Sequence, residues 1–460
     1  MTIDTDHWSG RLAELAARHH VPGATLGILR MAADGGEDEV AEAAYGLLNL
    51  RTGVETTVDS MFQLGSISKV WTATLVMQLV DEGRLQLDAP LIEVMPELSL
   101  GDPAVAAKLT MRHLLTHTSG IDGDILTDTG RGDDCLEKYA AGLAGAAQNH
   151  PLEATWSYCN SGYSLAGRVV EKLTGGTWDA AIRDRLVTPL GLTQTVTLPE
   201  DVLPYRAAMG HLTDEGEQIP APVWGIPRSA GPAGAIVATV ADLLLFARMH
   251  LNGGVAVDGT RVLSADSAAA MAAHQVELPD KHTLGDSWGL GWERADWGGH
   301  RLIGHDGNTI GQASYLRMLP EEGLAVTLLT NGGNGAKLYE ELYREIFDQL
   351  GGVPVPRPLG PPDEPVHVDM NPYLGVYERS SIRQQVLVGD NGPVMRVSVT
   401  GPLAEVLQAP DADYPMVPVA PDLFVCRDPE TGNWIPATFY QLPTGERYVH
   451  FGARATPAHG

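Results

Sequence analysis

A run of prolines divides this chain and limits the folds open to each part. Between Gly351 and Asp369 lie Pro354, Pro356, Pro358, Pro361, Pro362 and Pro365. Proline fixes φ and has no N–H to donate, so such a segment is typical of a stiff, extended linker. The sequence therefore predicts a first domain of residues 1–350, a linker of residues 351–369 and a second domain of residues 370–460.

The two parts have different hydrophobic periodicities. After the linker, short β-rich runs alternate with turn residues, at residues 373–377, 383–388, 394–399, 416–426, 437–442 and 448–454. This spacing predicts a small antiparallel barrel or sandwich. Before the linker, apolar residues follow helical spacing at residues 8–20, 70–80, 163–173, 240–251 and 337–350, while residues 24–30, 39–48, 305–318 and 324–330 resemble strands. We expect an α+β domain in which helices cover an antiparallel sheet beside an all-helical lobe, with a cleft between them.

Charge and hydropathy narrow the choice of partners. Lys and Arg number 31 against 58 Asp and Glu, a net charge of −27 that repels nucleic acid and anionic membranes. We find no run of 18 apolar residues, and the first residues are acidic rather than basic and apolar. The sequence therefore predicts a cytoplasmic protein that binds neither nucleic acid nor membrane.

Cysteine and histidine spacing gives no sign of a metal or cofactor. The three cysteines, Cys135, Cys159 and Cys426, are widely spaced and odd in number, so they indicate neither a disulfide framework nor a zinc cluster. His113 and His117 have the helical spacing of a metal pair, but Leu114 stands where a zinc motif would place glutamate. We expect these histidines to cap or pack, and Cys159 to be a small buried side chain.

Ser66 and Lys69 are the first candidate catalytic pair. They lie three residues apart at the start of a predicted helix, so both side chains fall on one face and the amine can reach the hydroxyl. Such a pair can form an activated nucleophile. The spacing is common by chance, and an N-cap serine beside a surface lysine is the simpler interpretation when the motif stands alone.

Two later motifs favour catalysis. Tyr158-Cys159-Asn160 precedes a helical pattern, and His305-Asp306-Gly307 follows a strand-like run. In this order the three motifs resemble those of the penicillin-recognising serine enzymes, Ser-x-x-Lys, Tyr or Ser with Asn, and Lys-Thr-Gly, although histidine replaces the last lysine. Residues 114–120 and 288–292 also resemble sequence motifs of the class C β-lactamase branch. The resemblance to that branch covers roughly residues 8–350. Several members carry a lipocalin-like barrel after this domain, and we expect one here.

The resemblance implies a role for each motif residue. Ser66 would attack a carbonyl, Lys69 would accept its proton, and Tyr158 would relay that proton to the leaving group. The backbone N–H groups of Ser66 and Asn308 would form the oxyanion hole. Asn160 would contact the acyl amide and hold Lys69.

The third motif and a later loop bear on the substrate. A neutral His305 offers a hydrogen bond but little charge to a carboxylate, which disfavours β-lactamase activity. Gly307 in the same motif is a further candidate for substrate binding. Trp224 lies in a Gly- and Pro-rich stretch that suggests a cleft border, where it would be either a substrate wall or a core plug.

Several acyl donors remain open. The motifs and the appended barrel resemble the penicillin-binding-protein-type thioesterases, which release nonribosomal peptides by head-to-tail cyclisation and take peptidyl thioesters from carrier-protein domains. The alternatives are a cytoplasmic esterase or D-stereoselective peptidase or amidase of the class C branch, and a β-lactam sensor that does not turn over. Arg454, at the predicted end of the last strand, matches the place of a barrel arginine in the cyclases. It would bind a carboxylate through its planar fork, or else simply end an exposed strand.

Overall fold

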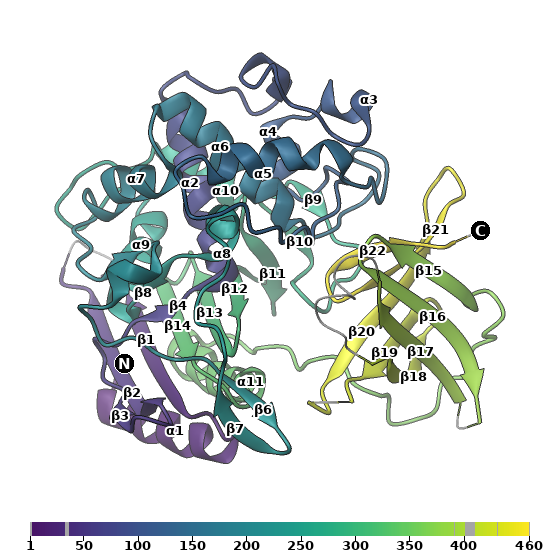
Figure 1. Ribbon diagram of the computed structural model, residues 1–460. Coiled ribbons are helices and arrows are strands. Elements are labelled where there is room, and N and C mark those ends of the chain that lie inside the picture. The colour runs from purple at the N-terminus through teal and green to yellow at the C-terminus, as the bar shows by residue number, and fades with distance from the viewer. Residues whose placement is uncertain (1, 33–35, 391, 401–409, 430, 460) are drawn as a thin grey trace.

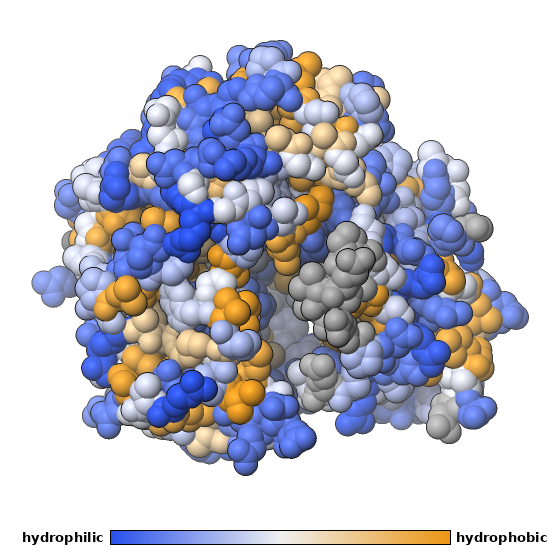
Figure 2. Space-filling view, in the orientation of Figure 1, coloured by the Kyte–Doolittle hydropathy of each residue, from blue (hydrophilic) through white to orange (hydrophobic). Residues whose placement is uncertain are grey.

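The computed structural model describes residues 2–32, 36–390, 392–400, 410–429 and 431–459. Figure 1 shows a larger body of helices and sheet beside a smaller barrel of strands. Residues 352–370, which join them, contain neither helix nor strand. Hydrophilic side chains cover most of the face seen in Figure 2, as the strongly negative net charge leads one to expect.

The larger body is built on a nine-stranded antiparallel sheet with the strand order β3-β2-β1-β14-β13-β12-β11-β10-β9. Its strands are β1 (Gly23–Arg30), β2 (Glu39–Asn49), β3 (Val54–Glu55), β9 (Val276–Glu277), β10 (Ser287–Trp288), β11 (Glu293–Trp297), β12 (His300–Thr309), β13 (Gln312–Leu319) and β14 (Leu324–Thr330). Residues of β1 and β14 are buried on both faces rather than alternately. Helices must therefore cover both sides of the centre of the sheet.

Two sets of helices provide that cover. On one face, α1 (Thr5–Arg18) and α11 (Gly335–Ile346) share a hydrophobic cluster with the sheet. On the other face, α2 (Ser68–Asp81) and α9 (Val240–Leu251) belong to the main core. Every residue from Ser68 to Leu79 is buried, because other helices of the larger body surround α2.

The predicted helical lobe is confirmed above α2 in Figure 1. It contains α3 (Pro103–Ala106), α4 (Met111–Leu115), α5 (Cys135–Gly142), α6 (Asn160–Thr174) and α7 (Trp178–Ile182). The smaller elements of the body are β4 (Phe62–Gln63), β5 (Thr195–Val196), β6 (His211–Asp214), β7 (Glu217–Pro220), β8 (Val237–Ala238), α8 (Gly231–Gly234) and α10 (Ala265–Ala272). No helix in the described ranges combines the length and apolar character that crossing a bilayer requires.

One strand prediction in this body is wrong. Residues 305–318 form no single strand, because β12 and β13 meet in a hairpin whose turn is Ile310-Gly311. Gly311 has a φ of 74°, which allows the chain to reverse there. His305 therefore lies in the middle of β12, with neighbouring strands on both sides.

The C-terminal strands form the predicted antiparallel barrel. They are β15 (Gly375–Arg379), β16 (Ile382–Gly389), β17 (Gly392–Val399), β18 (Ala412–Ala420), β19 (Leu423–Arg427), β20 (Trp434–Gln441), β21 (Arg447–Phe451) and β22 (Arg454–Pro457), paired in chain order. A bridge between Tyr377 and Ala458 nearly closes the barrel. Its core includes Tyr377, Met395, Phe424, Phe439 and Val449.

The barrel corrects two strand predictions. Residues 416–426 form parts of two strands, because β18 ends at Ala420 and β19 begins at Leu423. Residues 448–454 are not one strand, since Gly452 and Ala453, with φ values of 57° and 63°, form a tight turn between β21 and β22. Arg454 is consequently the first residue of the last strand and not the end of one. This turn points toward the larger body, where the carbonyl oxygen of Ala453 accepts a hydrogen bond from Tyr158 N at 3.0 Å.

Candidate active site

Ser66 and Lys69 meet where a short 3₁₀ turn, Gly65–Ile67, leads into α2. Lys69 Nζ donates to Ser66 Oγ at 2.8 Å and to the carbonyl oxygen of Ala233 at 2.7 Å. Gly65 has a φ of 49°, and a Cβ atom at this position would lie 2.6 Å from Asn308 N. The turn therefore needs glycine both for its backbone conformation and for its close approach to β12.

Lys69 is fully buried. Burial lowers its pKa well below the usual lysine range, the positive charge of Arg454 lowers it further, and Cys159 and Asp124 act in the opposite direction. Because the charged form is disfavoured, the side chain can exist as a neutral amine next to Ser66.

Tyr158 lies just before α6, and its ring is the next motif side chain that approaches Ser66 and Lys69. Its ring centre is 4.8 Å from Lys69 Nζ and 4.8 Å from Arg454 Cζ. Burial raises the pKa of the phenol, whereas Ser66 and Arg454 lower it. The Tyr158 hydroxyl is thus close enough to Ser66 to be influenced by it, but within the described chain it has no partner in hydrogen-bond geometry.

The neighbours of Tyr158 form an aromatic wall. His117 stacks on the tyrosine ring at 4.4 Å, and its Nδ1 accepts a hydrogen bond from Cys159 N at 2.9 Å. His113 caps α4 together with Thr110. Cys159 is buried, its Sγ accepts from Gly162 N, and burial raises the pKa of its thiol to about 11. The histidines cap and pack, and Cys159 is a small buried side chain, as predicted; the structure adds that Cys159 is the N-cap of α6.

His305 is buried in β12 as a neutral imidazole. Its Nδ1 donates to the carbonyl oxygen of Asp306 at 2.6 Å, and burial and the nearby Lys69 lower its pKa to about 3. Behind it lies an ionic cluster that the sequence did not predict, in which Arg317 contacts Asp306 at 2.6 Å and Glu293 at 3.4 Å. Burial and the charge of Asp306 raise the pKa of Glu293 to about 8.

Gly307 and Asn308 bring β12 against the nucleophile turn. A Cβ atom at Gly307 would lie 1.9 Å from the carbonyl oxygen of Leu64 and 2.4 Å from Ser314 Oγ, so no larger residue fits. The Leu64 backbone and the Ser314 side chain fill the space beside Gly307. Its predicted contact with substrate, and the oxyanion role of Ser66 and Asn308, remain predictions.

Asn160 does not hold Lys69 as expected. It begins α6, and its backbone N donates to Gly123 O at 3.0 Å. Among the residues that the structure describes, the hydrogen bonds of Lys69 Nζ go to Ser66 and to the Ala233 carbonyl. The backbone of α8 therefore provides the support that the sequence assigned to an amide side chain.

Trp224 borders a cavity beside the nucleophile turn. Its indole Nε1 donates to Ala208 O at 2.8 Å, and its carbonyl oxygen accepts from the Gln63 side chain. The cavity is small and partly open to solvent, and it is lined by Gln63, Leu198, Trp224, Ile226, Arg228 and Gly234, among others. These two hydrogen bonds fix the position of Trp224. Its contact with substrate remains a prediction.

The barrel contributes Arg454 to this site. Arg454 is held by Asp124, with Nη2 2.8 Å from Oδ1 and Nε 3.2 Å from Oδ2. One edge of the guanidinium fork is thus already occupied, which corrects the expectation that the whole fork is open to a carboxylate. Asp124 and Arg379, which also contacts Asp124, were missed because neither belongs to a motif.

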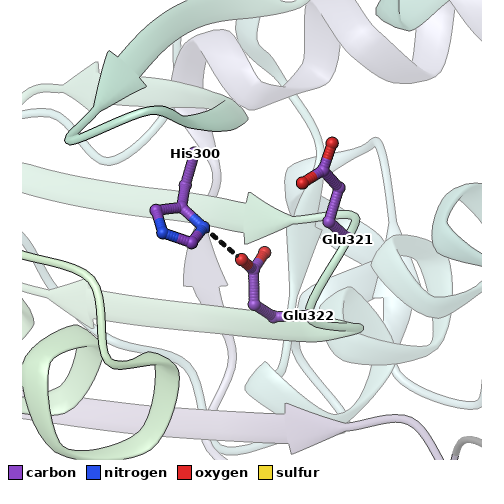
Figure 3. A group of neighbouring side chains, drawn as sticks. All are labelled: His300, Glu321 and Glu322. Atoms are coloured by element: carbon purple, nitrogen blue, oxygen red, sulfur yellow. Dashed lines mark hydrogen bonds and ion pairs between the residues drawn. The ribbon is translucent and has the colours of Figure 1, made fainter.

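One group resembles a metal-binding set outside this site. Figure 3 shows His300, Glu321 and Glu322 at neighbouring strand ends, with His300 Nδ1 2.5 Å from Glu322 Oε1. Their ligand atoms lie within 4.8 Å of one another, and Glu321 is exposed. His300 and Glu322 already pair with each other, and exposed acidic groups such as Glu321 are common without a metal ion, so we assign no metal site here.

Comparison with known proteins agrees with this geometry. The family model described as Beta-lactamase matches residues 8–351, so the chain belongs to the β-lactamase family, as the motifs suggested. It is an enzyme of the class formed by β-lactamases and penicillin-binding proteins, with a serine hydrolase fold.

Particular relatives show how far the likeness extends. Penicillin-binding protein 4 of Amycolatopsis lactamdurans is 49% identical over 382 residues, which cover 82% of this chain and 99% of that protein. The structure of SurE with D-Leu is 29% identical, covers 99% of both chains and has a TM-score of 0.75. Unguisins hydrolase of Aspergillus campestris is 24% identical over 420 residues, covering 81% of this chain and 76% of that protein.

Proposed function

We propose that Ser66 forms a covalent acyl-enzyme. Neutral Lys69 accepts the hydroxyl proton across the 2.8 Å contact as Oγ attacks the acyl carbonyl. The carbonyl oxygen becomes negative between the N–H groups of Ser66 and Asn308. When the bond to the leaving group breaks, the proton passes through Tyr158 to that group.

We further propose that the acyl donor is a peptidyl thioester and that the peptide's own amine releases it. The thioester C–S bond breaks as the Ser66 ester forms; the amine nitrogen then forms the C–N bond, and its proton returns through Tyr158 to Ser66 Oγ. The product is a head-to-tail cyclic peptide. A carrier-protein domain in the cytoplasm is the expected source of such a substrate.

The observation that carries this proposal is the position of Arg454 beside Tyr158. Because His305 is neutral, the third motif supplies no cation. The barrel supplies one instead, since Arg454 Cζ lies 4.8 Å from the Tyr158 ring centre. The barrel thus meets the catalytic body at Tyr158, which supports an enzyme that holds both ends of a peptide. The likeness to SurE, solved with D-Leu, extends over the barrel as well and supports a D-residue at the acyl end.

A D-stereoselective hydrolase is the second candidate. The likeness to unguisins hydrolase favours it, because that protein's name describes hydrolysis and the match covers 81% of this chain. In this case water would replace the peptide's amine as the nucleophile in the second step. Ser66, Lys69 and Tyr158 would keep the roles proposed above.

A peptidyl thioester analogue with a D-residue at its acyl end distinguishes the two. We expect a mass increase on Ser66 followed by cyclic product in excess over linear peptide. Linear product alone would establish the hydrolase instead. Absence of any adduct on Ser66 with thioesters and activated esters would remove both proposals, and Ser66→Ala provides the blank.

A further inference from the structure

Asp124 joins two arginines of the barrel to the catalytic body. Its Oδ1 and Oδ2 accept from Arg454 at 2.8 and 3.2 Å, and Oδ2 also accepts from Arg379 Nη1 at 2.6 Å. Arg454 begins β22, and Arg379 ends β15. The carboxylate comes from the loop between residues 121 and 135, so a single side chain ties two barrel strands to the body.

The Asp124 contact is partly buried, so solvent and salt screen it less than an exposed ion pair. The side chains of Arg379, Arg454 and Asp124 are 9%, 15% and 20% exposed. The two guanidinium groups hold the pKa of Asp124 far below its usual range, so its charge persists at any working pH. A buried pair with two parallel hydrogen bonds fixes the direction of an arginine as well as its place.

The Asp124 loop is itself fixed to Tyr158. A Cβ atom at Gly123 would lie 2.5 Å from Tyr158 O, and Gly123 O accepts from Asn160 N at 3.0 Å. On the other side, Tyr158 N donates to Ala453 O at 3.0 Å. Asp124, Tyr158 and Arg454 therefore form a closed ring of contacts across the two parts of the chain.

This ring leaves one nitrogen of Arg454 unused. Asp124 takes Nε and Nη2, whereas Nη1 makes no hydrogen bond to the residues that the structure describes and is not fully buried. Arg454 Cζ meanwhile stays 4.8 Å from the Tyr158 ring centre. Asp124 thus occupies one edge of the guanidinium, and Nη1 is left without a hydrogen bond to the described residues.

We propose that Asp124, supported by Arg379, is a positioning residue that fixes Arg454 so that Nη1 is offered to the nucleophilic end of the peptide beside Tyr158. The inference rests on the proposed cyclase function for the ligand of Nη1, but the positioning itself can be measured without it. If Asp124 only held the barrel against the larger body, any other hydrogen bond across the same interface would matter equally for the position of Arg454.

Arginine side-chain NMR tests the positioning directly. The Nε–H signal of Arg454, assigned by its loss in Arg454→Lys, should exchange slowly with water in the full-length protein. Asp124→Asn should abolish this slow exchange. Asp413→Asn is the matched control, because Asp413 pairs with Arg396 on the barrel surface at 2.7 and 2.9 Å. A slowly exchanging Arg454 signal in Asp124→Asn would overturn the proposal.

Product analysis tests the consequence. With the peptidyl thioester, Asp124→Asn and Arg454→Ala should each lower the cyclic-to-linear ratio roughly tenfold, as expected for one lost charge-assisted bond. The double variant should fall no further than Arg454→Ala, since both changes remove the same interaction. Tyr440→Phe, which removes the 2.9 Å bond to Thr155 across the same interface, should keep the wild-type ratio. Multiplying losses in the double variant, or an equal loss in Tyr440→Phe, would contradict positioning.

The two proposals can fail separately. If the wild type releases only linear peptide, the cyclase function fails while the NMR result still decides the role of Asp124. If Asp124→Asn does not fold, Arg379→Gln is the second variant, because it removes the support and leaves the Asp124–Arg454 pair. It should speed the exchange of the Arg454 signal, and unchanged exchange would count against the support.

Discussion

His305 Nδ1 lies 2.6 Å from the carbonyl oxygen of Asp306. A carbonyl can only accept, so Nδ1 carries the proton and Nε2 the lone pair. Because burial and Lys69 lower the pKa of His305 to about 3, the imidazole should remain neutral from pH 8 to pH 5. Ring-carbon NMR shifts, assigned with His305→Asn, should therefore stay constant over this range. A titration midpoint between pH 5 and pH 8 would show that the third motif does supply a cation.

Lys69 should be needed as a base and not as a charge. Lys69→Met and Lys69→Arg are both expected to slow acylation of Ser66 by about 10²–10⁴-fold, since neither side chain can accept the serine proton. The rate of mass increase with an activated ester measures this. Lys138→Met, on an exposed lysine paired with Asp134, is the control. Near wild-type acylation by Lys69→Arg would mean that a positive charge suffices.

The local part of the site could be predicted from the sequence. Ser66 and Lys69 lie on one helix face because of their spacing alone, and the barrel follows from evenly spaced β-rich runs. Tight turns were harder to find. Ile310-Gly311 and Gly452-Ala453 each lie inside a run that we predicted as one strand, and in each case that run is a hairpin. Nothing but a single glycine marks either turn.

The ionic partners could not be predicted, because their meaning lies in distant contacts. Asp124 and Arg454 are 330 residues apart, and Asp124 stands in an acidic stretch that contains no recognisable motif. Glu293 and Arg317 likewise become informative only once strands β11, β12 and β13 place them behind His305. The support of Lys69 by Ala233 involves a backbone carbonyl, which no side-chain motif records.

Arg454→Ala should separate aminolysis from hydrolysis. The variant loses the donor proposed for the nucleophilic end of the peptide but keeps Ser66 and Lys69, whose hydrogen bond lies within the larger body. We expect cyclisation to fall roughly tenfold or more, while hydrolysis of a small activated ester, measured at a pH where the wild-type rate is constant, changes little. Equal loss of both reactions would mean that Arg454 serves acylation itself and not the choice of nucleophile.

Buried histidines should make the fold sensitive to acid. Burial lowers the pKa of His250, His305 and His450 to about 3 and that of His150 to about 4. The unfolded chain takes up protons near pH 6.5 and the folded chain does not, so stability falls as the pH drops from about 6.5 toward these values. The sign is the same for each residue, because each native pKa lies below the unfolded one.

His250 allows this linkage to be measured away from the site, since its Nε2 contacts Thr74 Oγ1 at 3.1 Å inside the main core. His250→Gln keeps a polar side chain that does not titrate. Urea unfolding at pH 7 and pH 5 should show a loss of stability in the wild type that the variant reduces by about 2 kcal/mol, the free energy of withholding one proton over that interval. An unchanged difference between the two pH values would mean that His250 is protonated in the folded protein, and that the acid sensitivity arises from other groups.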